Sequence, residues 1–399
     1  MKVCFYFQVH QPMRLAPFSI FAPDGGEQTS MFERYFDHAL NRQILEKVAR
    51  KCYLPTNALL LEALEKNPDL KLAFSITGVF LEQARLYMPE VVDSFSSLAK
   101  TGRVEFLSET YYHSLSSLFA EKTEFEEQVK LHRAAIAPFA QTPSVFRNTE
   151  AMFSNDIAYW AERMGYAGVM TEGLDQMLGW RSPTYTYKVK GCSSIRALLR
   201  HYKLSDDIGY RFSQKSWSEW PLTADKFASW LSATPGDCVN LFMDYETFGE
   251  HHWEDTGIFA FLRQLFPEIS KHRHLSFATP GEVARTIAPQ GEVDMPHVIS
   301  WADMERDTSA WLGNDMQRAA FAELTGLEKP IKALGDDDLL RTWRHLQNSD
   351  HLYYCCTKSL SDQDVHNYFS PYESPFDSFI NYMNVLQDLK AQVKKREKK

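Results

Sequence analysis

The sequence has few of the cysteine and glycine patterns that mark metal, redox or nucleotide sites. Its 399 residues include six cysteines, none of them in a C-x-x-C pair. Paired cysteines build zinc sites and disulfide scaffolds, so we expect reduced and mostly buried thiols instead. No G-x-S-x-G, G-x-G-x-x-G, P-loop or H-E-x-x-H motif occurs. The serine-hydrolase elbow, the common nucleotide-binding loops and the H-E-x-x-H zinc helix are therefore excluded.

Long apolar runs and excess positive charge are also missing. No run reaches the roughly 18 apolar residues of a membrane span, and the N-terminal apolar stretch is too short for a secretory signal. The net charge of −9 argues against a nucleic-acid partner, because phosphate binding depends on positive charge. We expect a cytoplasmic protein without membrane contact, and the sequence leaves self-association into a homo-oligomer open.

What the chain does contain is an alternation of short apolar runs with amphipathic stretches. The runs predict strands at 3–9, 71–77, 104–107, 144–147, 167–171, 194–199, 239–244 and 275–278. Such βα alternation predicts an α/β fold with a parallel sheet, and this number of units favours a closed barrel. Helical periodicity replaces the strand signal after about residue 310. We therefore divide the chain into a barrel domain, 1–285, and a helical domain, 286–399.

The most informative segment is 241–253, which follows an apolar run. It carries Asp244, Glu246 and Glu250, and then the adjacent His251 and His252. Charged groups are costly to bury, so a strand that ends in several of them is expected to face a pocket. Asp244 and Glu246 alternate by two and share one face of an extended backbone.

Polar side chains follow the other predicted strands in the same way. His10 follows the first strand, His113 comes shortly after the third, and Arg147 and Glu150 end the fourth. In a parallel barrel the carboxyl ends of the strands meet at one mouth, where catalytic groups sit. These residues are expected to converge there, although ion pairs at the barrel rim would give the same pattern.

Two carboxyl groups from different strands are the minimum set for glycoside hydrolysis. Glu150 and Asp244 are the best pair, because each ends an apolar strand. Arg147 would keep a nearby carboxylate ionised, as a nucleophile requires. Glu246 and burial would raise the pKa of Asp244, as a general acid requires.

Two other classes compete with this interpretation. Histidines 10, 113, 251 and 252 with Asp244 could bind a divalent metal, as in a metal-dependent polysaccharide deacetylase. The histidines include no i, i+4 pair, however, and adjacent histidines on an extended segment point to opposite faces. A non-catalytic glycan-binding protein is the second alternative, and the presence of both Glu150 and Asp244 argues against it.

These residues lie in segments that resemble the motifs of glycoside hydrolase family 57, and within it the α-amylase-like branch. Five motifs occur in order: FQVHQP at 7–12, GRVEF at 102–106, FRNTE at 146–150, MDYETFGEH at 243–251 and HLQNSDHLYY at 345–354. Segments 301–307 and 311–317 resemble a further stretch of that branch. The first motif often has a second histidine two positions before His10, where this chain has Gln8.

The resemblance implies an incomplete (β/α)7 barrel with a helical C-terminal domain, retention of anomeric configuration and no required metal or other cofactor. It implies hydrolysis of α-1,4-glucosidic bonds in malto-oligosaccharides, starch or glycogen. A 4-α-glucanotransferase, a branching enzyme and an α-galactosidase use related sites and stay open as alternatives.

The same resemblance implies roles for single residues. Glu150 is the expected nucleophile and Asp244 the expected acid/base, while Glu105 is expected to support the nucleophile. Asp350 is expected to contact a sugar hydroxyl, or else to cap a helix. The remaining residues expected at the substrate are His10, His113, Arg147, Glu246 and His251, with Trp301 and Trp311 as stacking surfaces.

Overall fold

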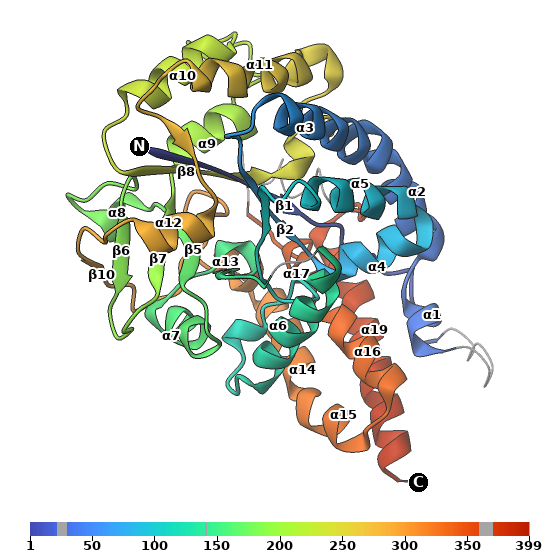
Figure 1. The fold of residues 1–399 in the computed structure, drawn as a ribbon. Coiled ribbons are helices and arrows are strands. Elements are labelled where there is room, and N and C mark those ends of the chain that lie inside the picture. The colour runs from blue at the N-terminus through green and yellow to red at the C-terminus, as the bar shows by residue number, and fades with distance from the viewer. Residues whose placement is uncertain (22–29, 140–141, 359–369, 399) are drawn as a thin grey trace.

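The computed structural model, drawn in Figure 1, describes residues 1–21, 30–139, 142–358 and 370–398. Its strands are β1 (Lys2–Val9), β2 (Leu72–Ile76), β3 (Val104–Phe106), β4 (Val145–Arg147), β5 (Gly168–Glu172), β6 (Thr186–Val189), β7 (Arg196–Arg200), β8 (Cys238–Asp244), β9 (Ser276–Phe277) and β10 (Glu292–Val293). Each of the eight runs that the sequence predicts as strands overlaps one of these strands, so the predicted strand positions are confirmed.

Seven parallel strands close into a barrel. Strand β1 lies between β8 and β2, β2 pairs with β3, and β4 pairs with β5, which pairs with β7. A parallel bridge between Ser108 and Phe146 joins the ends of β3 and β4. The ring closes through a single registered pair of β7 and β8, Arg200 with Asn240. This weak seam, beside which β6 pairs antiparallel to β7, agrees with the expected incomplete (β/α)7 barrel.

Helices cover the outside of the barrel and form the C-terminal region (Figure 1). They are α1 (Met31–Tyr35), α2 (His38–Val48), α3 (Leu54–Lys66), α4 (Gly78–Tyr87), α5 (Pro89–Ala99), α6 (Thr123–Ile136), α7 (Asn155–Arg163), α8 (Asp175–Leu178), α9 (Tyr202–Gly209), α10 (Ala224–Ala233), α11 (Ile258–Ser270), α12 (Pro280–Thr286), α13 (Ser309–Leu312), α14 (Asp315–Gly326), α15 (Glu328–Leu334), α16 (Asp337–Leu346), α17 (Ser349–Tyr353) and α19 (Pro375–Glu397). No helix in the described ranges is long and apolar enough to cross a bilayer.

The barrel interior is packed at the end where the strands begin. Cys4, Tyr6, Leu107 and Phe242 belong to one buried cluster, to which Val283 of α12 also contributes. Side chains fill this interior as they do in other small barrels, so it is a core and not a channel. The polar groups that follow the strands are left for the opposite, carboxyl-terminal end.

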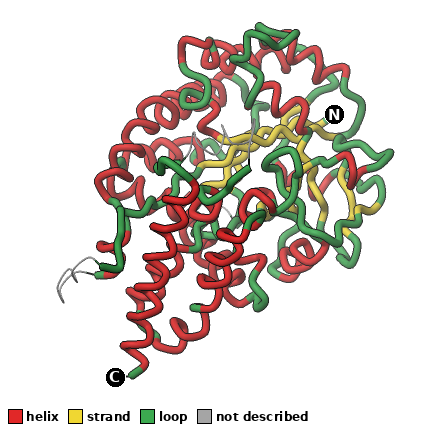
Figure 2. The backbone as a smooth tube through the Cα atoms, turned by 180° about the vertical axis from the view of Figure 1, so that it is seen from behind, coloured by secondary structure: helices red, strands yellow, loops and turns green. Residues whose placement is uncertain are grey.

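The C-terminal helices share a hydrophobic cluster with the barrel. Trp343 of α16 and Tyr382 of α19 belong to the same cluster as Phe146 of β4 and Val169 of β5. Figure 2 shows these helices running away from the strands toward the C-terminus. Strand β10 pairs with β6, so the sheet continues beyond residue 285. The helical region is therefore an extension of the barrel core, packed where it can reach the carboxyl ends of the strands.

Candidate active site

Glu150 lies in η4 (Thr149–Ala151), the turn directly after β4, in an uncommon backbone conformation. Its φ of 56° and ψ of 27° place it in the left-handed region, which a non-glycine residue adopts at a cost. The backbone N–H of Trp301 donates to the Glu150 carbonyl oxygen at 3.3 Å. This contact from the C-terminal region thus helps to hold the left-handed backbone conformation of Glu150.

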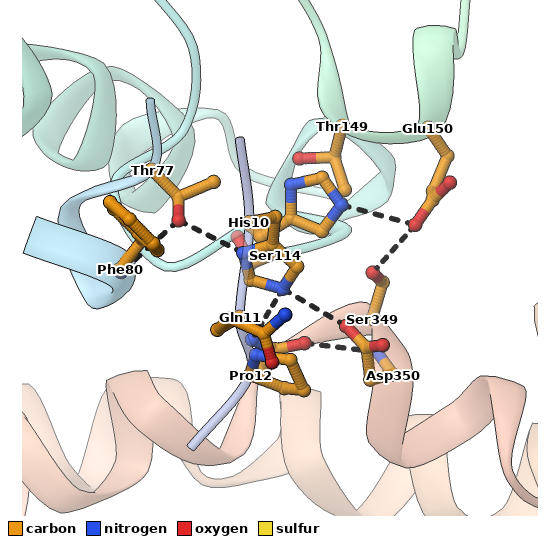
Figure 3. A network of polar contacts seen from close by, with 12 residues as sticks. His10, Gln11, Pro12, Thr77, Phe80, Ser114, Thr149, Glu150, Ser349 and Asp350 are labelled. Carbon is orange, nitrogen blue, oxygen red and sulfur yellow. Dashed lines mark hydrogen bonds and ion pairs between the residues drawn. The ribbon is translucent and has the colours of Figure 1, made fainter. Parts of the chain in front are cut away.

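The Glu150 carboxylate accepts three hydrogen bonds from three parts of the chain. His113 Nε2 and Ser349 Oγ each lie 3.1 Å from Oε1, and Trp301 Nε1 lies 3.1 Å from Oε2. Figure 3 shows Glu150 above Ser349, which begins α17. Two of the three donors come from beyond residue 285, so the C-terminal region completes this site.

These surroundings favour the ionised form of Glu150. Burial raises the pKa of the carboxyl group, but the hydrogen bond with His113 and the charges of His113 and Arg147 outweigh it. The pKa of Glu150 therefore lies below its ordinary value. A carboxylate that stays ionised in a buried site can act as a nucleophile.

Asp244 ends β8 and has the opposite electrostatic character. Burial, together with the nearby charge of Glu150, raises its pKa to about 6. Glu246 follows in η5 (Tyr245–Thr247), where burial and the charge of Asp244 raise its pKa to about 8. The hydroxyl of Tyr53 donates to Glu246 Oε1 at 2.5 Å. Two carboxyl groups with pKa values pushed apart are the arrangement expected of an acid and a nucleophile.

His10 and Asp350 form a second polar group beside Glu150 (Figure 3). His10 Nδ1 lies 2.9 Å from Thr77 Oγ1, and its Nε2 lies 3.1 Å from Asp350 Oδ2. Burial alone would raise the pKa of Asp350, but the hydrogen bond with His10 and its charge bring it to about 2. The helix cap of α17 is Asn348, whose side chain accepts from the Asp350 N–H. Asp350 therefore does not cap this helix, and its side chain lies beside His10.

Arg147 and Trp301 lie together near Glu150. The Arg147 guanidinium is 4.8 Å from the centre of the Trp301 ring and almost fully buried. Arg200 approaches the same ring at 5.7 Å and pairs with Glu172 at 3.0 Å. The ring that we predicted as a sugar-stacking surface contacts two guanidinium groups, while its N–H serves Glu150.

Two other predicted site residues lie away from this pocket. Glu105 Oε1 accepts from Ser144 Oγ at 3.0 Å, and its Oε2 accepts from the Gly281 N–H of α12 at 2.7 Å. These contacts place it at the packed end of the barrel. Trp311 is fully buried and its ring centre lies 6.0 Å from that of Tyr353. Glu105 is thus packed against α12 and Trp311 lies in a core, and their roles at the substrate stay predictions.

His251 follows η5, and its backbone N–H donates to the Glu246 carbonyl oxygen at 2.9 Å. Burial lowers the pKa of its side chain to about 4. His252 turns elsewhere, with Nδ1 at 2.7 Å from Ser213 Oγ. Within the described ranges no group of three or more His, Cys, Asp or Glu side chains is arranged to hold a metal ion. The metal-binding set considered from the sequence therefore does not assemble.

Sequence reasoning assigned no role to Glu109 or Ser349. Glu109 is fully buried and lies 3.3 Å from His113 Nδ1, on the side of the ring away from Glu150. Its signal was present, because Glu109 follows the third predicted strand as the other polar side chains follow theirs. Ser349 had no signal of its own, since nothing in a lone serine beside Asp350 indicates which way its hydroxyl points.

Comparisons with known proteins find relatives of this chain. The family model of glycosyl hydrolase family 57 matches residues 4–296. The chain is 46% identical over 405 residues to a Methanocaldococcus jannaschii protein named "Putative alpha-amylase", covering 99% of this chain and 85% of that protein. It is 30% identical over 299 residues to an alpha-amylase of Pyrococcus furiosus, covering 73% of this chain but 43% of the longer relative.

A solved structure shares the fold over nearly the whole length. It is a branching enzyme of the same family from Pyrococcus horikoshii, with a TM-score of 0.66 and 13% identity. The superposition covers 98% of this chain and 94% of that one. At this identity the likeness concerns the fold, which includes both the barrel and the C-terminal helices.

Proposed function

This chain belongs to glycosyl hydrolase family 57, and on that premise we propose that it hydrolyses α-1,4-glucosidic bonds of malto-oligosaccharides, starch or glycogen with retention. The observation that carries the proposal is the pair of carboxyl groups with opposed environments. Glu150 is held ionised by three donors, whereas the pKa of Asp244 is raised to about 6. The names of the relatives support a glucan as the substrate.

In the first step Glu150 attacks the anomeric carbon. Oε1 already accepts two hydrogen bonds, so Oε2, which accepts one, keeps a lone pair for the new C–O bond. The bond from the anomeric carbon to the leaving oxygen breaks, and Asp244 gives that oxygen its proton. The products are a shortened glucan and a covalent glycosyl-enzyme.

In the second step Asp244, now a carboxylate, takes a proton from water as the water oxygen attacks the anomeric carbon. The bond to Glu150 breaks and its electron pair returns to the carboxylate. Both groups regain their starting protonation, and two inversions at one carbon give net retention. The hydrogen bond from His113 Nε2 to Oε1 stabilises the negative charge that returns to Glu150.

Three polar groups are placed to hold the sugar beside the reacting bond. His10 and Asp350 face the pocket as a pair, and Glu246 follows Asp244 by two residues. We assign them to sugar hydroxyl contacts, since each combines burial with a polar atom at the mouth of the barrel. The sugar-stacking role is not assigned to a tryptophan.

Glucan transfer is the alternative, because one of the solved structures that share the fold is a branching enzyme. A 4-α-glucanotransferase would use the same two carboxyl groups and pass the glycosyl unit to a sugar hydroxyl in place of water. The α-galactosidase alternative, the cytoplasmic location and self-association stay predictions.

The test is turnover of maltoheptaose followed by separation of the products by size. We expect shorter oligosaccharides from the wild-type protein, and longer ones as well if transfer competes. Glu150→Gln should lower kcat by on the order of 10⁴-fold, and Asp244→Asn by roughly 10²–10⁴-fold. Glu46→Gln, a surface carboxylate on α2, is the matched control and should keep wild-type turnover. Near-normal turnover in Glu150→Gln would overturn the assignment, and zinc-restored activity after chelation would support a deacetylase instead.

A further inference from the structure

We propose that Glu109 is a positioning residue that holds His113 as an imidazolium against the nucleophile Glu150. The inference rests on the proposed function for its consequence in catalysis. The charge of His113 follows from the hydrogen-bond geometry and does not depend on the proposed function. No motif in the sequence assigns a role to Glu109.

The ring of His113 lies between two carboxyl groups. Its Nδ1 is 3.3 Å from Glu109 Oε2 and its Nε2 is 3.1 Å from Glu150 Oε1. An ionised carboxylate only accepts hydrogen bonds, and a neutral imidazole has one nitrogen that also only accepts. With both carboxyl groups ionised, each ring nitrogen must therefore carry a proton, which makes the ring a cation.

Glu109 is built to stay ionised. Its Oε1 accepts from Gln8 Nε2 at 3.1 Å and also from the hydroxyl of Ser75. The hydroxyl of Tyr6 donates to Gln8 Oε1 at 2.6 Å, which leaves the amide N–H₂ of Gln8 facing Glu109. Glu109 is fully buried, so these donors and His113 replace the water it lacks. Gln8, at the position where the family motif often has histidine, thus donates a hydrogen bond to Glu109.

The backbone of His113 is fixed as firmly as its ring. Its φ of 52° is left-handed, like that of Glu150, and its carbonyl oxygen accepts from the Ser349 N–H at 2.9 Å. Ser114 Oγ, one residue on, donates to Gln128 Oε1 of α6 at 2.7 Å. His113 and Glu150, which share a hydrogen bond, both have strained left-handed backbones. Strained residues of this kind cluster at functional sites.

Other charged and titratable groups face this pair from the neighbouring elements. His10 of the β1 end stacks on the His113 ring at 4.0 Å, Arg147 lies at the end of β4, and His132 of α6 contacts the Glu109 N–H. Burial lowers the pKa of His113, but the hydrogen bonds with Glu109 and Glu150 bring it to about 9. For Glu109, burial raises the pKa while the hydrogen bond with His113 and nearby positive charges bring it to about 2.

The catalytic consequence concerns the charge on Glu150. In the resting enzyme the His113 cation favours the ionised nucleophile. In the glycosyl-enzyme Glu150 is a neutral ester, and Glu109 alone keeps His113 charged until the electron pair returns to Glu150. Without Glu109, the ring would lose its charge near physiological pH, and the electron pair would return to Glu150 beside a neutral ring.

The experiment compares the pH dependence of kcat/KM in wild type, Glu109→Gln and Glu46→Gln. Loss of the Glu109 charge lowers the pKa of His113, and an opposite charge within a few ångströms is worth about 1–3 pKa units. We therefore expect kcat/KM of Glu109→Gln to fall relative to wild type as pH rises through that lowered pKa, to roughly a tenth of wild type at pH 7.5, while the acid limb stays in place. Glu46→Gln removes a surface charge and should match wild type at every pH. A ratio of Glu109→Gln to wild type that does not change with pH would overturn the inference.

A double-mutant cycle tests whether Glu109 acts through His113. His113→Gln should itself lower kcat/KM at pH 7.5, and adding Glu109→Gln should lower it no further. Additive losses would contradict a path through His113. Should Glu109→Gln fail to fold, Ser75→Ala removes one donor to Glu109 and should give a smaller loss at pH 7.5 in its place, and no loss would count against the inference.

The charge of His113 can be read without any substrate. Selective ¹⁵N labelling of histidine with NMR should show one ring, absent in His113→Gln, that is doubly protonated at pH 7.5 in the wild type and neutral in Glu109→Gln. A neutral ring in the wild type would refute the inference. Because this reading needs no turnover, inactivity on glucans would sink the proposed function and leave the result on Glu109 intact.

Discussion

At the residue scale, the site depends on environment rather than on residue type. Glu150 and Asp244 are both carboxylic acids, yet three hydrogen-bond donors surround the first while burial beside a negative charge dominates the second. Neutralising a carboxyl group costs little, whereas burying its charge without partners costs much. The structure thus assigns an ionised and a protonated member at mildly acidic pH.

This contrast predicts a bell-shaped dependence of kcat/KM on pH. Activity needs Glu150 ionised and Asp244 protonated, so it should be lost as pH falls through the lowered pKa of Glu150. It should also be lost as pH rises through the pKa of Asp244, about 6. The measurement is kcat/KM for maltoheptaose from about pH 3.5 to 8. A profile that stays flat from pH 5 to 8 would show that Asp244 is not the titrating acid.

Single residues also mark what the sequence could and could not predict at this scale. Asp244 and Glu150 followed from strands that end in charge, and the structure puts both at the barrel mouth. The sequence could not separate the two glutamates after the third predicted strand begins, since only the structure shows that Glu105 contacts Gly281 while Glu109 contacts His113. It could not separate the uses of Trp311 either, because an aromatic residue suits a core as well as a sugar.

At the element scale, a buried ion pair fastens the C-terminal helices to the barrel. Arg344 of α16 contacts Glu124 of α6 at 3.0 Å, and Lys332 of α15 contacts the same carboxylate at 2.9 Å. Glu124 is fully buried and also accepts from Gln128, whose own partner is Ser114 beside His113. The elements that carry Ser349 and His113 are thus tied through one polar cluster.

Arg344→Met should destabilise the protein because it leaves Glu124 with fewer partners. Breaking a buried pair costs roughly 3–5 kcal/mol, and we expect about 3 kcal/mol in the free energy of unfolding since Lys332 remains. Arg42→Met removes an exposed pair with Glu46 on α2 and should cost about 0.5 kcal/mol or less. Chemical denaturation of both variants measures the difference. Equal, small losses in the two variants would show that the cluster does not hold the elements together.

Elements were predictable in proportion to their length and apolar content. The barrel strands are short apolar runs between helical stretches, and the sequence placed each of them. Strands β6, with the sequence TYKV, and β10, with the sequence EV, escaped because neither lies in an apolar run. The π-helical turn η1 (Ala49–Tyr53), which brings Tyr53 to Glu246, also left no pattern to detect.

At the scale of the whole molecule, barrel and helices form one catalytic unit. The proposed boundary at residue 285 separates sequence patterns, but one hydrophobic cluster spans both sides of it. The site spans it too, because Trp301 and Ser349 reach Glu150 from the C-terminal side. Sequence patterns predict where helices begin and end; they do not predict which apolar faces will share a core.

The most direct test of the central claim is the configuration of the newly formed reducing end. Proton NMR of maltoheptaose at early times, before mutarotation, distinguishes α- from β-anomeric products. Attack by Glu150 followed by water predicts α-anomers first, from the wild type and not from Glu150→Gln. Initial β-anomers would contradict the double displacement, and the roles given to Glu150 and Asp244 with it.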